Sequence, residues 1–450
     1  MKREEARTQK IDRRRLVKSA AITAGVAGAT AVAGKGALAS GAAPTVISGQ
    51  SCSQDKQSIR ALMWQNSPTI DGHFKDRVKA FNDAHKDTVE VDLQFLPYDQ
   101  YWQKLQLAYS SGKPYDVYFW DVQAYGHYTR GLLLNLQPMM DKAGLFDATE
   151  YPVKLFEPWK LDGKNYYAVP ENFQTMALYY NKTLFDAEKL AVPDDKWTWA
   201  QIVEAAQKLT KRDGDRVNQW GMVTGALTVW WGMQTLSWAQ GSAFFDKILE
   251  PTKFMFTDPA NVATLSFVQG LVNQEKVAPS GAVSQQSPET TGFASGRVAL
   301  AADGSWAMSG YADLPFEWGM TAIPTWEGKR VAPYFMGGWV IAKDSKVPEG
   351  AFEWVRWSAT DYQDQMAKEH DWIPILNSAR ESAVAFEGLP AGYKEAVASL
   401  ANAKLGDLYC KNNQQIWVEV FDPNITDLVN NNPDPKEVAK KMNDAANALL

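Results

Sequence analysis

Apolar and polar side chains alternate strictly over residues 89–95, VEVDLQF, with the apolar ones at Val89, Val91, Leu93 and Phe95. A period of two is typical of a strand that is buried on one face. The segment just before it places large apolar residues at helical spacing, in FKDRVKAF at 74–81. A strand and a helix that follow each other in this way predict an α/β architecture.

Two later helices are expected from the residues that begin them. Thr198 and Gln201 form a capping-box pattern ahead of an apolar stripe, and Asp258 precedes Pro259 at a predicted first helical position. Proline and glycine cluster over residues 277–292, which predicts a long surface loop.

The first forty residues resemble an export signal. A basic stretch at 12–18, DRRRLVK, precedes a mildly apolar run at 19–34, and Ala-Leu-Ala ends at residue 39. The paired arginines resemble a twin-arginine signal, and Ala-x-Ala suits a signal peptidase. A basic arm or a membrane anchor is the alternative, but the run is shorter than the ~20 residues that span a bilayer. We expect a signal peptide at 1–39, a linker at 40–57 and a periplasmic or other extracytoplasmic location.

Charge and composition narrow the class of partner. Residues 1–39 hold nine Lys and Arg against three Asp and Glu, a net of +6, so a whole-chain charge of −6 becomes −12 once they are removed. An acidic surface argues against a nucleic-acid partner. The 18 Trp residues, with 17 Tyr and 19 Phe, favour a ligand with flat faces that aromatic rings can cover.

The two cysteines, Cys52 and Cys410, are far apart in the chain. In an oxidising compartment they could form a disulfide, or they could be two free thiols. Lipid attachment at Cys52 is a weaker alternative, because the preceding SGQS lacks the apolar residue such sites use.

Catalytic and metal motifs are missing from the sequence. The histidines lack the close spacing of zinc ligands, so no metal and no cofactor is expected; they are His73, His85, His127 and His370. There is no G-x-S-x-G, no phosphate loop and no G-x-G-x-x-G turn. Carboxylates beside aromatic residues do occur, as in Trp120-Asp121, and these could be a glycosidase acid and base, acceptors for sugar hydroxyls or solvated loop groups.

Several blocks, taken in order, resemble one family. They are GKPYDVYFWD at 112–121, NYYAVPENFQTMALYYNKTLFDAEKL at 165–190, DKWTWAQIVEAAQKLT at 195–210, GFASGRVALAADGSWAMSG at 292–310, GMTAIPTWEG at 319–328 and GGWVIAKDSKVPEGAFEWVRW at 337–357. Over residues 58–450 the chain is similar to the extracellular solute-binding proteins of ABC importers, in the sugar-binding, maltose-binding-protein-like group.

The resemblance implies a two-lobed α/β periplasmic-binding-protein fold with hinge strands and a ligand cleft between the lobes. Lobe one would comprise 55–168 and 327–384, lobe two 171–322 and 385–450, with crossings at 168–170 and 322–324. Small-molecule sites commonly form at such boundaries.

A sugar site needs aromatic planes for the C–H faces and polar groups for the hydroxyls. On these grounds and on the resemblance, we expect ligand contacts from Trp64, Asn66, Trp120, Asp121, Glu171, Asn172, Trp230, Trp306, Gly338, Trp339 and Trp417. Within LTVWWGMQTLSW at 227–238, Trp230 and Trp231 lie about 100° apart on a helix. We expect Trp230 to meet ligand, and Trp231 and Trp238 to pack inward.

The expected function is capture and delivery without catalysis. The lobes would close around a sugar, expected to be an oligosaccharide, and the membrane permease, which works with a separate cytoplasmic ATPase, would recognise the closed form. The binding protein would be a monomer. Two alternatives stay open. One is binding of a non-sugar solute such as glycerol phosphate, a polyamine or an iron complex, and the other is an exported glycosidase.

Overall fold

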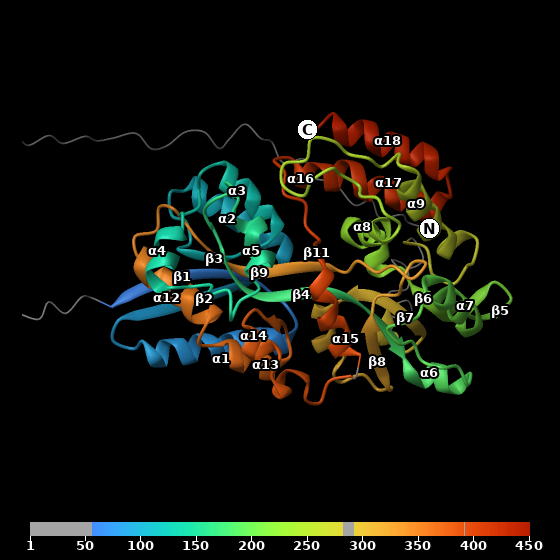
Figure 1. Ribbon diagram of the computed structural model, residues 1–450, viewed down its shortest axis with the longest axis horizontal. Coiled ribbons are helices and arrows are strands. Elements are labelled where there is room, and N and C mark those ends of the chain that lie inside the picture. Colours follow the sequence, from blue (N-terminus) through green and yellow to red (C-terminus); the bar gives the residue numbers. More distant parts are fainter. Residues whose placement is uncertain (1–55, 282–291, 391) are drawn as a thin grey trace, which may run out of the picture. The chain divides into compact units, whose positions relative to one another are not determined.

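The computed structural model describes residues 56–281, 292–390 and 392–450 (Figure 1). The predicted signal peptide, most of the linker and Cys52 lie outside these residues, as does most of the loop expected at 277–292. Cys410 is buried. Residues Gln54–Leu450 form one compact unit.

The strands join in one 11-stranded sheet with the order β2-β1-β3-β9-β4-β7-β6-β5, with β8 and β10 paired to β4 and β11 paired to β9. Their bounds are β1 Gln57–Trp64, β2 Val89–Leu96, β3 Val117–Phe119, β4 Val169–Asn181, β5 Lys211–Asp213, β6 Arg216–Val223, β7 Val298–Gly304, β8 Trp318–Ala322, β9 Pro333–Ile341, β10 Ile373–Pro374 and β11 Lys404–Leu405. The strand expected at 89–95 is β2, which pairs in parallel with β1.

Two of the helices, α7 and α9, begin where the sequence predicted them. Their bounds are α1 Pro68–Ala84, α2 Tyr98–Ser110, α3 Tyr125–Thr129, α4 Gln137–Ala143, α5 Val153–Phe156, α6 Lys182–Ala187, α7 Trp199–Leu209, α8 Trp230–Ala239, α9 Pro259–Asn273, α12 Pro348–Ala359, α13 Gln363–Glu369, α14 Asn377–Arg380, α15 Tyr393–Ala398, α16 Asn413–Gln415, α17 Asp422–Asn431 and α18 Pro435–Asn447. The capping box of Thr198 and Gln201 starts α7, and Asp258 caps α9 ahead of Pro259.

Strand β4 joins two hydrophobic cores. Phe173 and Ala177 belong to the core that contains the side chains of β1, β3 and α12, whereas Met176 and Leu178 belong to the core of α7, α8, α9 and α18. Side chains of a strand alternate between its faces, so one strand can serve both cores. Figure 1 shows β4 in green beside β9 in orange, its antiparallel partner. The lobe limits expected from the sequence stay a prediction.

Among the described residues, none of the helices is both long and apolar enough to span a bilayer.

Candidate ligand-binding site

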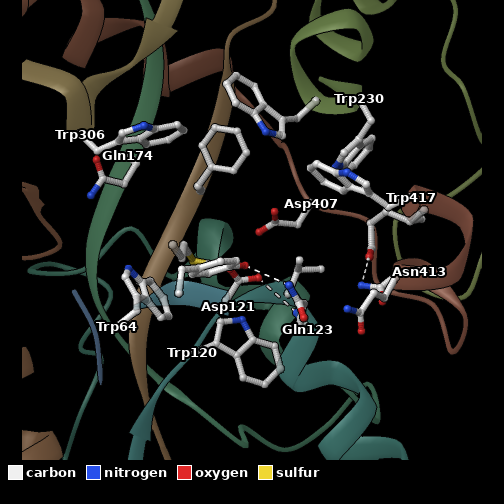
Figure 2. A pocket seen from close by; sticks show the side chains of 18 of the residues that line it. Trp64, Trp120, Asp121, Gln123, Gln174, Trp230, Trp306, Asp407, Asn413 and Trp417 are labelled. Carbon is white, nitrogen blue, oxygen red and sulfur yellow. Dashed lines mark hydrogen bonds between the residues drawn. The ribbon is translucent and has the colours of Figure 1, made fainter. Parts of the chain in front are cut away.

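A cavity of about 830 Å³ opens among the ends of the central strands, the start of α8 and the segment from Asp407 to Phe421 (Figure 2). Fifteen of its 34 lining residues are aromatic: Trp64, Tyr98, Phe119, Trp120, Trp230, Trp231, Phe244, Phe245, Phe254, Phe256, Trp306, Phe335, Trp372, Trp417 and Phe421. Cavities of this size, largely apolar with a few polar groups, are typical of small-molecule sites.

Trp64 ends β1 and forms one side of the cavity. Its ring meets those of Tyr98, Tyr101 and Phe119 edge to face, with centroids 5.1–5.7 Å apart. Asn66 follows in the same turn, where its Nδ2 donates to the carbonyl of Trp64 at 3.2 Å. Both residues line the cavity, as the sequence led us to expect.

Asp121 follows the short strand β3 and faces the cavity from a fixed position. It caps the 3₁₀ turn Val122–Ala124 through Oδ1, which accepts from the main-chain N–H of Gln123 at 3.2 Å. Its Oδ2 accepts from the hydroxyl of Tyr98 at 2.6 Å. Burial raises the pKa of the Asp121 carboxyl, and the Tyr98 hydrogen bond opposes that shift.

Trp120 contributes little more than an edge to the cavity. Only 2% of its surface is exposed, because its ring packs on Trp159 and Tyr409. The ring therefore supports the cavity wall more than it presents a face to a ligand.

Two amides of β4 reach the cavity from the middle of the sheet. Gln174 has its Oε1 held by the hydroxyl of Ser305, which donates at 3.0 Å. Asn172 is buried, and its Oδ1 has no hydrogen-bond partner among the described residues. A buried acceptor without a partner is costly, so a ligand or water is expected to use it.

The start of α8 corrects one expectation about the tryptophans. Trp230 and Trp231 both line the cavity, because α8 begins at Trp230 and its first turn faces the open space. Trp231 meets Trp306 and Phe335 edge to face at 5.6 and 5.3 Å, so it does not simply pack inward. Trp238, at the far end of the helix, is buried away from the cavity as expected.

Trp417 lies in the π-helical turn Ile416–Phe421, just before α17. Its Nε1 donates to Asp422 Oδ2 at 2.6 Å, which orients the ring, and the ring meets Trp230 edge to face at 6.4 Å. Figure 2 shows these two rings on one side of the space and Trp64 on the other.

Asp407 is a cavity residue that the sequence did not reveal. It follows β11, and Figure 2 shows its carboxylate pointing into the space that Asp121 also faces. Burial together with the nearby Asp121 charge raises the pKa of Asp407 to about 8, while the Tyr409 hydroxyl donates to its Oδ2 at 3.3 Å. Other polar or aromatic lining residues that were not predicted include Tyr98, Gln123, Gln174, Trp231, Asn413 and Gln414.

Glu171 and Trp339, two predicted contacts, do not line the cavity. Glu171 is the extra residue of a bulge, since Pro170 pairs with Gly338 and Asn172 with Gly337. Its fully buried carboxylate accepts from Arg77 at 2.9 Å and from Trp339 Nε1 at 2.7 Å. The bulge turns this side chain into the core, where it neutralises a buried guanidinium.

Gly338 is also absent from the cavity lining. A Cβ there would lie 2.2 Å from the carbonyl oxygen of Val169, so the residue lets β9 approach β4 closely and does not serve a ligand. Its neighbour Gly337 does line the cavity.

Among the described residues, one group of side chains outside the cavity could hold a metal ion. His73, Glu369 and Asp371 place ligating atoms within 4.8 Å of one another. His73 Nδ1 lies 2.6 Å from Asp371 Oδ2, so these two groups already form a hydrogen-bonded pair.

Among the described residues that line the cavity, none is Lys, Arg or His. The wall therefore offers aromatic faces, amides, hydroxyls and two carboxylates, and no cationic group. An anionic ligand would find no counter-charge there.

The model of the bacterial extracellular solute-binding protein family matches residues 66–364 of the chain. The chain belongs to this family, as the sequence resemblance predicted. Its α/β fold is that of the two-lobed binding proteins, which confirms the predicted fold class.

Individual relatives bind different solutes. The chain is 25% identical over 328 residues to the arabinooligosaccharide-binding protein of Bacillus subtilis, covering 69% of this chain and 72% of that one. It is 22% identical over 269 residues to the sn-glycerol-3-phosphate-binding periplasmic protein of Rhizobium meliloti, covering 56% and 59%. The ABC substrate-binding protein Lmo0181 from Listeria monocytogenes, solved with cycloalternan, superposes with a TM-score of 0.77 at 22% identity, covering 88% and 99%.

Proposed function

We propose that this protein captures an oligosaccharide outside the cytoplasm and delivers it to an ABC importer by closing two lobes around it. The observation that carries the proposal is the cavity wall, in which tryptophans stand on opposite sides and amides and carboxylates lie between them. Rings cover the C–H faces of sugars, and the polar groups accept from hydroxyls. Relatives named for oligosaccharides support this ligand class.

The site residues follow from the same wall. We propose that Trp64, Trp230, Trp306 and Trp417 provide the stacking faces. Trp231 adds a fifth. Asn66, Asp121, Asn172 and Asp407 are proposed to hold hydroxyls, with Trp120 supporting them from beneath. Glu171, Gly338 and Trp339 are assigned a structural role and no ligand contact.

The transport setting is part of the proposal. We infer export by the twin-arginine-type signal at 1–39, action as a monomer, and recognition of the closed form by permease subunits that work with a separate ATPase. The family's extracellular character supports this setting.

Two other functions are alternatives to sugar capture. Glycerol phosphate is disfavoured because the described wall holds no basic side chain for a phosphate. A glycosidase would use two carboxylates as acid and base, so Asp121 and Asp407 must be tested for catalysis.

A thermal-shift panel of linear and cyclic oligosaccharides tests the proposal. A ligand at a hundred times its Kd stabilises the folded state by about 2.7 kcal/mol, so binding should raise the Tm. No rise with any sugar would count against the ligand class. New reducing ends after prolonged incubation with a bound sugar would show hydrolysis, and the protein would then be a glycosidase and not a receptor.

A further inference from the structure

The cavity wall is unusual in its balance of charge. Two carboxylates, Asp121 and Asp407, face one space that is otherwise lined by aromatic rings and neutral polar groups. No described lining residue is basic, so neither carboxylate has an ion-pair partner in the wall. A carboxylate in such surroundings keeps its charge only at a high free-energy cost.

The hydrogen bonds around the pair come from neutral donors. Asp121 accepts from the Tyr98 hydroxyl and the Gln123 main chain, and Asp407 accepts from the Tyr409 hydroxyl. Phenolic and amide donors stabilise a carboxylate without cancelling its charge. Without a ligand, no positive charge in the described wall therefore balances the two carboxylates, and protonation of Asp407 removes one of the two negative charges.

We propose that the preferred ligand is a sugar that carries a protonated amine, and that this amine sits between Asp121 and Asp407. The inference rests on the proposed sugar-binding function and narrows its substrate class. An ammonium group would donate charge-assisted hydrogen bonds to both carboxylates. Tryptophan faces around it, such as those of Trp230 and Trp417, also attract cations.

The net charge of the chain agrees with a cationic ligand. Without residues 1–39 the chain has a net charge of −12, which raises the local concentration of cations near its surface.

Titration provides a signature that a neutral sugar lacks. A bound ammonium lets Asp407 ionise, so binding releases a proton whenever Asp407 is protonated in the free protein. Affinity for the protonated amine should then rise with pH below the pKa of Asp407, by up to about tenfold per pH unit, until the amine itself begins to lose its proton. The titratable groups near Asp407, namely Asp121 and the hydroxyls of Tyr409 and Tyr334, also have raised pKa values, and a neutral sugar brings no positive charge that would lower them.

Matched sugars separate the amine from the rest of the ligand. Isothermal titration would compare maltotriose with its derivative that carries one primary amine in place of a hydroxyl, and the glucosamine trimer with its N-acetylated form and with cellotriose. We expect at least one amine to bind about tenfold or more tightly than its neutral match. Asp407→Asn should bring the ratio of amine affinity to neutral-sugar affinity close to one. Asp121→Asn should lower the same ratio, and it serves as the second variant in case Asp407→Asn does not fold. Asp313→Asn, which removes the same charge from an exposed site outside the described lining, should leave the ratio as it is.

Each other outcome overturns the inference in a distinct way. If neutral sugars bind as well as or better than their amines, the protein is still a sugar receptor but its preferred ligand is not an amine. A preference for the amine that persists in both Asp variants would also contradict the proposed site. If no sugar of either kind binds, the proposed function fails with it. If spermidine binds more tightly than every sugar, the ligand is a polyamine.

Discussion

Two tryptophan–carboxylate pairs lie in one sheet and have opposite surroundings: one follows β3, and the other is formed by β4 and by β9, the strand between β3 and β4. Asp121 follows β3 beside Trp120, accepts only from neutral donors and faces the cavity. Glu171 lies in the bulge of β4 beside Trp339, is fully buried and has its own cation in Arg77. A carboxylate that already holds a guanidinium is occupied by the fold, whereas one held by neutral donors can still bind a positively polarised ligand. Residue type and position at a strand end do not distinguish the two.

The largest effect is expected at the buried pair. Glu171→Gln removes the only carboxylate that lies within 3 Å of the Arg77 guanidinium among the described residues and leaves it Glu369 at 4.0 Å, so it should lower the free energy of unfolding by about 3–5 kcal/mol. Urea denaturation followed by circular dichroism measures it. Adding Arg77→Met to Glu171→Gln should recover part of the loss, because the guanidinium that lost its hydrogen-bonded carboxylate is removed as well. A loss below about 1 kcal/mol would show that the pair is not the structural element we describe.

Substitutions in the cavity wall are expected to change sugar affinity more than stability. Trp306→Ala removes a ring that meets both Trp231 and Phe335 at the wall, and sugar affinity should fall about tenfold to a hundredfold. Titration calorimetry measures it with whichever sugar the panel identifies. Trp339→Phe is the matched control, expected to lower stability while affecting affinity less. If both variants lost affinity alike, the two tryptophans would not be separated as the structure places them.

The pH dependence of stability should expose Asp407 in the protein without ligand. Its folded-state pKa is raised to about 8, above its unfolded value, so the folded state holds a proton that the unfolded state releases between about pH 4 and pH 8. Stability from this group is therefore present below pH 4 and is lost as pH rises to 8. Asp407→Asn should gain stability relative to the parent over this window, by at most about 1.4 kcal/mol per pH unit. Parallel unfolding curves at every pH would contradict the raised pKa.

The sequence predicted the elements of this fold better than the contents of its cavity. Period-two alternation in β2 and the caps of α7 and α9 are local signals, so they could be read directly. The bulge that turns Glu171 inward depends on how β4 pairs with β9, and a pairing register over a long separation leaves no mark in a single sequence.

Asp407 and Trp231 were missed for related reasons. Asp407 follows a two-residue strand with no readable periodicity, and only the fold brings it opposite Asp121. For Trp231, the 100° separation on a helical wheel tells which residues share one side of the helix, whereas the cavity meets the first turn of α8, where adjacent residues can both face it.

The smallest effect lies at the border between the two regions. Asn172 follows Glu171 directly, lines the cavity, and has an Oδ1 without a partner among the described residues. Asn172→Ala should weaken sugar binding about threefold to tenfold, the size of one hydrogen bond, and change the free energy of unfolding by less than about 1 kcal/mol. Titration calorimetry and urea denaturation on the same sample measure both. Because the bulge sends adjacent side chains to opposite environments, a stability loss as large as that of Glu171→Gln would mean that Asn172 belongs to the buried network and that the cavity ends one residue earlier.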